Sequence, residues 1–66
     1  KDMSYIIELK VAKDEKELKE ITENAINQIK EKEYYTEFKA KKLENVSLIG
    51  ITFCGKKVGF ISEAVN

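Results

Sequence analysis

Apolar positions divide the chain into two short runs with a longer, charge-rich segment between them. Residues 3–11 are rich in β-forming side chains, and residues 46–53 form a near-continuous apolar run. Short runs of this kind, bounded by polar residues, are typical of strands. The sequence then predicts a tight turn at 54–57 and a short returning strand at 58–61.

The charge-rich segment between the two runs predicts an amphipathic helix. Its apolar residues recur at spacings of three and four, which places them on one stripe: Leu18, Ile21, Ala25 and Ile29. Asp14 is a good N-cap residue, and Glu17 completes a capping-box-like pair three positions later. We therefore expect a helix over residues 14–32 that continues or restarts as far as residue 40.

The order strand, helix, strand, strand predicts an α/β fold, a β-α-β-β unit with a small mixed sheet and one long helix on one face. A helix between two strands implies a right-handed crossover, so the first two strands should be parallel. Apolar residues on the second side of the first strand indicate that both of its faces are mostly buried: Tyr5, Ile7, Leu9 and Val11. One helix cannot cover both faces, so the monomer should have an open face and edge and should need a partner copy or further domain.

Composition removes several kinds of chemistry. The chain has 66 residues, no histidine and one cysteine, Cys54, which excludes histidine-based zinc sites and triads and an intrachain disulfide. We interpret Cys54 as a small buried residue or an unreactive turn thiol. A lone cysteine in a chain rich in lysine and glutamate is typical of a protein in the reducing cytoplasm. Twelve basic and twelve acidic residues give no net charge, so composition alone does not indicate nucleic-acid binding, and no apolar run is long enough to span a membrane. The chain starts almost directly on a strand, without an initiator methionine, and reads as a single partial domain over 1–66.

Glu8 and Lys10 are the candidates for chemistry. Strand side chains alternate, so both should project from one face of residues 3–11. Charged side chains in an apolar strand are costly unless they are paired, solvated or metal-bound. One carboxylate with a nearby ammonium suits magnesium-dependent phosphodiester hydrolysis, in which the lysine orients water and counters developing charge. The alternative is a plain salt bridge near a strand end.

The helix offers further candidates. Gln28 should point toward the sheet, with Lys32 on the same side, and could donate to a phosphate or a metal-bound water near Glu8; otherwise it is a boundary residue bonded to backbone. Tyr34 and Tyr35 follow, and aromatic side chains at a helix end more often pack than bind ligands. Two basic groups could contact a nucleic-acid backbone but are more typical of solvated loops: Lys39, Lys41 and Lys42, and Lys56 with Lys57.

Three segments together resemble the C-terminal part of the PD-(D/E)xK nuclease superfamily. They are Tyr-Ile-Ile-Glu-Leu-Lys at 5–10, Ala-Ile-Asn-Gln-Ile-Lys-Glu-Lys-Glu-Tyr-Tyr at 25–35, and Leu-Ile-Gly-Ile-Thr-Phe at 48–53. The sequence is most similar to the branch of bacterial and archaeal proteins that carry this domain behind an AAA-ATPase-like domain. The resemblance implies a restriction-endonuclease-like core: a mixed sheet with helices on its faces and the Glu-x-Lys motif on a central strand.

The resemblance also implies roles for individual residues. Glu8 matches the metal-binding acid, Lys10 the catalytic lysine, Gln28 the glutamine of the motif that follows the core in the RecB-like branch, and Tyr34 its tyrosine. Magnesium is the expected cofactor and nucleic acid the expected partner of the complete domain. The family also needs an aspartate on the strand that precedes the Glu-x-Lys strand, and we expect that strand to lie outside this sequence. Asp2 falls in the expected connecting turn, so we do not accept it as the replacement. We therefore expect this chain to be catalytically silent alone.

Two alternatives to a nuclease fragment stay open. The chain could be a self-associating module in which Glu8 and Lys10 are structural. It could also be a degenerate nuclease domain of a larger ATPase protein that binds nucleic acid without cutting it. Under each of them the uncovered sheet predicts a homo-oligomer, most simply with a two-fold axis.

Overall fold

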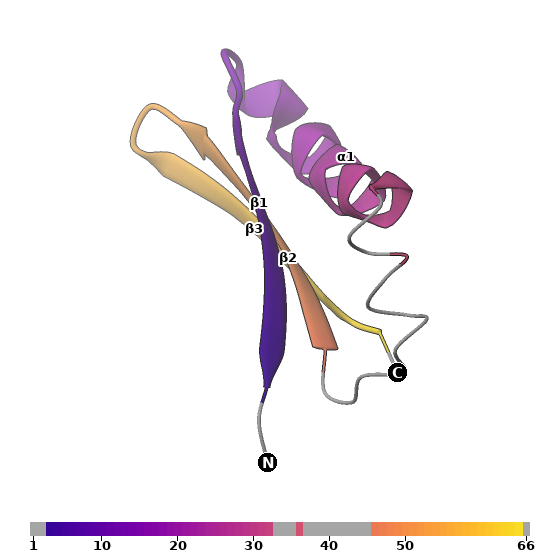
Figure 1. The fold of residues 1–66 in the computed structure, drawn as a ribbon. Helices are drawn as coiled ribbons and strands as arrows, with labels where there is room; N and C mark the ends of the chain where they lie inside the picture. The colour runs from indigo at the N-terminus through magenta and orange to yellow at the C-terminus, as the bar shows by residue number, and fades with distance from the viewer. Residues whose placement is uncertain (1–2, 33–35, 37–45, 66) are drawn as a thin grey trace.

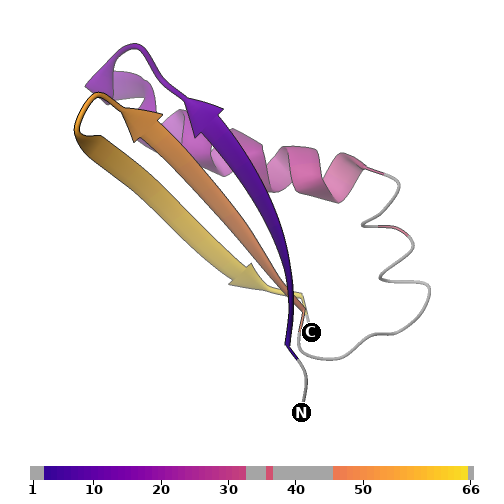
Figure 2. The ribbon, with the colours of Figure 1, turned by 60° about the vertical axis from the view of Figure 1, so that its left-hand side comes forward.

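The computed structural model describes residues 3–32, 36 and 46–65 (Figures 1 and 2). In chain order the elements are strand β1 (Ser4–Val11), the 3-10 turn η1 (Glu15–Glu17), helix α1 (Leu18–Glu31), strand β2 (Val46–Cys54) and strand β3 (Lys57–Ala64). The α/β prediction is confirmed: one mixed sheet of three strands carries the helix on one face.

The sheet has the strand order β1-β2-β3, with β1 parallel to β2 and β2 antiparallel to β3. The predicted parallel pairing of the first two strands is therefore confirmed. The expectation that Glu8 and Lys10 lie on a central strand is wrong for the described sheet, where β2 is central and β1 is an edge. The reason is that β2 pairs on both sides, whereas no described strand pairs with the outer side of β1.

The hairpin between β2 and β3 turns at Gly55, whose φ of 59° lies in the left-handed region that glycine adopts without strain. Cys54 pairs with Lys57 across this turn. β3 is longer than the predicted 58–61, because its antiparallel pairing with β2 continues to the last pair, Ala64 with Ser47. The sequence did not predict this extension because residues near the end of β3 are polar: Ser62 and Glu63.

The helix is shorter than predicted at both ends. Asp14 does act as a cap, but of the 3-10 turn: its Oδ1 accepts a hydrogen bond from the Lys16 backbone N–H at 3.0 Å. Glu17 makes no side-chain capping bond, so the predicted capping box is wrong. α1 ends at Glu31 because Lys32 has an extended backbone, with φ −89° and ψ 153°. The predicted continuation to residue 40 falls almost entirely outside the described residues.

The helix packs closely against the centre of the sheet. A Cβ built on Gly50 would lie 2.9 Å from the Thr22 carbonyl oxygen and 3.1 Å from the Ala25 Cβ, so only glycine allows this approach. Next to Gly50 the buried hydroxyl oxygens of Thr22 and Thr52 are 2.7 Å apart. The Thr22 hydroxyl donates its proton to the Leu18 carbonyl oxygen. Since a hydroxyl has one proton, Thr52 must donate to Thr22. The helix face that packs on the sheet therefore includes a buried polar residue, Thr22, which the predicted apolar stripe did not contain.

The hydrophobic core lies between α1 and the two strands β1 and β2. It is made of Ile6, Ile26, Ile29, Val46 and Leu48, with Ile61 and Val65 packed against it. Ile29 and Leu48 are fully buried. Two stripe residues, Leu18 and Ile21, are only half-buried, while Ile26, which the stripe did not include, is buried.

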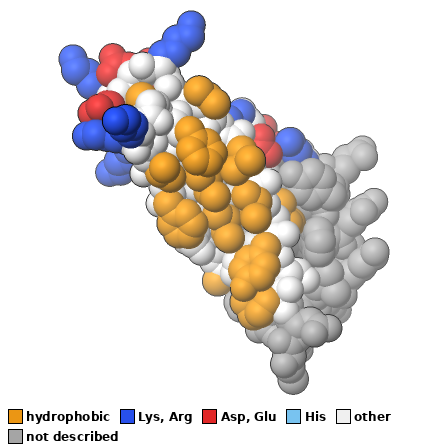
Figure 3. Space-filling view, turned by 90° about the vertical axis from the view of Figure 1, so that its left-hand side faces the viewer, with side chains coloured by type: hydrophobic (Ala, Val, Ile, Leu, Met, Phe, Trp, Pro, Cys, Tyr) orange, Lys and Arg blue, Asp and Glu red, His pale blue; other side chains and the backbone are white. Residues whose placement is uncertain are grey.

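The opposite face of the sheet is apolar and open, as Figure 3 shows. The prediction that β1 is buried on both faces is wrong here, because one helix covers only one face; the predicted open face is confirmed. Pairing registers place the residues in rows across the sheet, such as Leu9, Ile51 and Phe60. The large apolar residues that are 44–79% exposed are Met3, Tyr5, Ile7, Leu9, Val11, Phe53, Val58 and Phe60.

Candidate active site

Glu8 and Lys10 both project from the helix side of β1. Ile6, two residues before Glu8 on the same side, is buried in the core, whereas Glu8 and Lys10 are half-buried at its margin. The Glu8 Oε2 lies 3.9 Å from the Lys10 Nζ. The alternation of the strand thus brings the two charges to one face, at the border between the core and solvent.

The pairing of β1 with β2 sets the position of these charges relative to the helix. Glu8 is level with Gly50 and Lys10 with Thr52, two β2 residues that lie against Thr22 of α1. Because α1 is held over β2 there, the charged side chains of the edge strand extend along the flank of the helix. The close packing at Gly50 therefore fixes the distance between the two elements that form the site.

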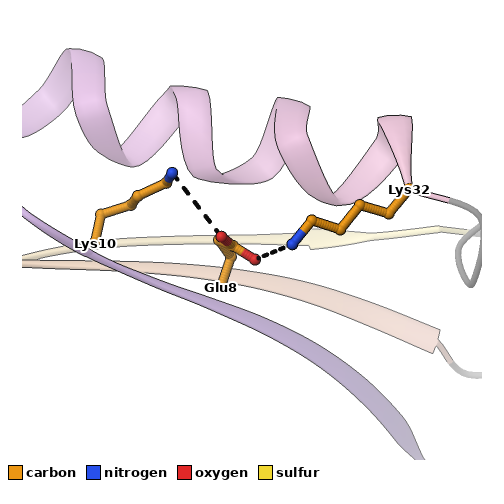
Figure 4. Close-up of polar contacts among 3 residues, drawn as sticks. All are labelled: Glu8, Lys10 and Lys32. Carbon is orange, nitrogen blue, oxygen red and sulfur yellow. Dashed lines mark hydrogen bonds and ion pairs between the residues drawn. The ribbon is translucent and has the colours of Figure 1, made fainter.

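Lys32 brings a third charge from the C-terminal end of α1. Its Nζ donates a hydrogen bond to the Glu8 Oε1 at 3.2 Å (Figure 4). We call Glu8, Lys10 and Lys32 the charged cluster. The helical spacing predicted Lys32 on the side of Gln28 but indicated no role for it, because only the packing of α1 on the sheet brings Lys32 to Glu8. The sequence signal that could have identified Lys32 is its spacing, four residues after Gln28 on the same side of the helix.

The other predicted site residues are less tightly tied to Glu8. Gln28 is half-buried on α1, one helical turn before Lys32. Among the described residues no side-chain hydrogen bond joins it to Glu8 or Lys10. Tyr34 lies outside the described residues, as do Tyr35 and the basic group at 39–42.

The second basic group and the cysteine are placed away from the charged cluster. Lys57 is exposed and pairs with Glu15, with 3.2 Å between Nζ and Oε1. It lies at the hairpin end of the sheet together with Lys56. Cys54, the last residue of β2, is a buried free thiol, as the sequence predicted. No helix in the described ranges has the length and apolar character needed to cross a bilayer.

The charged cluster has two ammonium groups for one carboxylate, so its local excess is one positive charge. Such an excess suits a phosphodiester, which is an anion. A complete magnesium site is not formed by the residues described, since no three acidic, histidine or cysteine side chains gather among them. Glu8 offers a single carboxylate, and an ammonium group faces each of its oxygens. The described residues therefore supply at most one of the protein ligands of a magnesium site.

The comparison with protein families agrees with this arrangement. The model of the PD-(D/E)XK nuclease superfamily matches residues 1–63. The chain belongs to the PD-(D/E)XK nuclease superfamily. No curated protein and no solved structure matches it.

Because the chain belongs to the PD-(D/E)XK nuclease superfamily, the acid and the lysine on β1 can be compared with the motif of that superfamily. Glu8 and Lys10 have the Glu-x-Lys spacing of the motif after which the superfamily is named, and they lie inside the matched residues. PD-(D/E)XK nucleases typically depend on a divalent metal and act on nucleic acids. The chain is accordingly a nuclease-type domain sequence, with a positively charged cluster where its sheet and helix meet.

Proposed function

We propose that this chain contributes one part of a metal-dependent phosphodiesterase site that cleaves nucleic acid. The observation that carries this proposal is the half-buried carboxylate of Glu8, held on one face of β1 with Lys10 and close to the end of α1. A carboxylate in this position can serve as one magnesium ligand in the complete domain, and the further acidic ligand comes from outside the described residues.

The roles that we assign follow the charges. The Lys10 ammonium neutralises negative charge that develops on phosphate oxygens during cleavage and helps to orient the attacking water. Gln28 is half-buried on α1, one helical turn before Lys32. Its amide N–H groups can donate to a phosphate oxygen. Tyr34 is assigned to the site from its match to the tyrosine of the family motif alone.

The proposal predicts that a divalent cation binds at Glu8, weakly, because only one carboxylate is available. We expect Mn²⁺ titrated into the ¹⁵N-labelled chain to broaden the amide signals of residues 7–10 first, through its unpaired electrons. Glu8→Gln should remove this selective broadening. Glu63→Gln is the matched control, since Glu63 is also an ion-paired carboxylate, 2.7 Å from Lys30. Equal broadening in wild type and Glu8→Gln would contradict the proposed site.

A second prediction concerns activity. With one carboxylate at the site, we expect the 66-residue chain to leave supercoiled plasmid DNA intact in Mg²⁺ or Mn²⁺. Gel electrophoresis of plasmid incubated with micromolar chain is the measurement. Reproducible nicking by the wild-type chain that Glu8→Ala abolishes would show that the site is complete without the further ligand.

The wider context is also part of the proposal. We propose further that this chain is the C-terminal half of a nuclease domain in a cytoplasmic ATPase protein. This proposal is supported only by the resemblance of its sequence motifs to those of proteins that carry such a domain behind an AAA-ATPase-like domain. In that setting the complete domain binds nucleic acid. The alternative is a degenerate nuclease domain that binds nucleic acid without cutting it. Such a domain would keep the lysines but lack the second acidic metal ligand.

The open sheet face supports a second proposal, self-association. Its eight large apolar residues are on average more than half exposed. If each large side chain offers ~200 Å², the open area is on the order of 900 Å², which exceeds the patches of most monomers and reaches the ~800 Å² per partner of a standard interface. Charged side chains gather at one end of the face and leave its centre free (Figure 3). We propose a second copy as the occupant, related by a two-fold axis.

A further inference from the structure

We propose that Lys32 is a built-in competitor of the metal ion: it neutralises Glu8 when no metal is bound and must leave the Glu8 carboxylate when a divalent cation arrives. The inference rests on the proposed function of Glu8 as a metal ligand. It assigns Lys32 as a positioning residue of the site, one that acts through Glu8.

The geometry singles out Lys32 from the other lysine of the charged cluster. Its Nζ lies 3.2 Å from the Glu8 Oε1 and donates a hydrogen bond, whereas the Lys10 Nζ lies 3.9 Å from Oε2, beyond hydrogen-bonding distance. The two ammonium groups approach the carboxylate from different elements (Figure 4). Lys32 thus occupies the oxygen that a metal ion would otherwise find open.

Burial explains why the carboxylate needs such a partner. The Glu8 side chain is only 18% exposed, and a half-buried carboxylate without a partner loses much of its hydration. A charge-assisted hydrogen bond offsets part of this loss. A divalent ion beside the same oxygen would repel the Lys32 ammonium, so the two cations cannot share it.

The position of Lys32 allows it to give way. It follows the last residue of α1, its backbone is extended, and its side chain is 44% exposed. A lysine side chain is long and flexible, and its ammonium is readily hydrated. On leaving Glu8 it stays within reach of the same region of the site, where it adds positive charge for an incoming phosphate.

The test compares Lys32→Met with Lys30→Met in the Mn²⁺ broadening experiment. Methionine keeps the length and apolar stem of lysine and removes the charge. Lys30 is the matched control, because it lies on the same helix and forms its own ion pair with Glu63. We expect Lys32→Met to reach half-maximal broadening of residues 7–10 at about tenfold lower Mn²⁺, the size expected for removing a unit charge a few ångströms from a divalent ion in a water-rich site. Lys30→Met should match wild type.

The possible outcomes separate this inference from the proposed function. Unchanged Mn²⁺ affinity in Lys32→Met, or an equal gain in Lys30→Met, would overturn the competitor role and leave the metal site at Glu8 in place. Selective broadening at residues 7–10 in none of the chains would overturn both proposals. Lys32→Gln provides a second neutral variant, and the dispersion of its amide spectrum shows whether the fold is intact.

Discussion

Leu48→Ala is expected to lower the free energy of unfolding by about 2–5 kcal/mol, the range for removing a fully buried leucine. Leu48 lies on the central strand β2, has no exposed surface and belongs to the hydrophobic core. A chain of 66 residues, in which the described part has one helix over the sheet, rarely has a margin above ~3–5 kcal/mol. The variant should therefore be largely unfolded at 25 °C, seen as loss of far-ultraviolet circular dichroism and of amide dispersion.

Leu9→Ala is the matched control, because it removes the same atoms from a leucine that is 61% exposed on the open face of β1. Urea unfolding at the lowest usable protein concentration, where self-association contributes least, should show a loss below about 1 kcal/mol for this variant. A loss in Leu9→Ala as large as that in Leu48→Ala would mean that the core is not between α1 and β2. Unchanged stability of Leu48→Ala would mean the same.

The sequence predicted the element order because its periodicities are clear. The β-forming run that became β1 and the apolar run that became β2 flank the helical stripe, and these local signals decide element type. Parallel pairing of β1 and β2 then followed from the crossover. Element ends were less predictable: Glu17 has the spacing of a capping box, yet the chain forms a 3-10 turn there and Asp14 caps that turn.

The candidate site was predictable only in part, because its residues come from different elements. Glu8 and Lys10 share a face for a purely local reason, the alternation of side chains along a strand. The arrival of Lys32 at Glu8 depends on how closely α1 packs at Gly50 and on where the helix ends, neither of which a periodic pattern specifies. The edge position of β1 is likewise a property of the whole sheet.

The open face of the sheet and the charged cluster lie on opposite sides of β1, so partner binding and chemistry need not compete for surface. Odd-numbered residues of β1, such as Leu9, project to the open face, while Glu8 and Lys10 project toward the helix. A dimer formed through the open face would leave the charged cluster exposed to substrate. This separation makes self-association testable without disturbing the site.

Phe60→Lys should weaken self-association by roughly 100-fold or more. Phe60 is exposed in the middle row of the open face, beside Ile51. In a two-fold interface each substitution occurs twice, and the loss of a central aromatic anchor typically costs ≥2 kcal/mol. Sedimentation equilibrium over a wide range of protein concentration measures the dissociation constant directly.

Asn27→Lys is the control for this experiment, since it adds the same charge at an exposed position of α1, on the other side of the sheet. It should leave the dissociation constant of the wild-type dimer unchanged, whereas Phe60→Lys should shift the chain to monomer. A wild-type chain that sediments as a monomer even at high micromolar concentration would show that a second copy does not cover this face. A dimer that tolerates Phe60→Lys would place the interface elsewhere on the molecule.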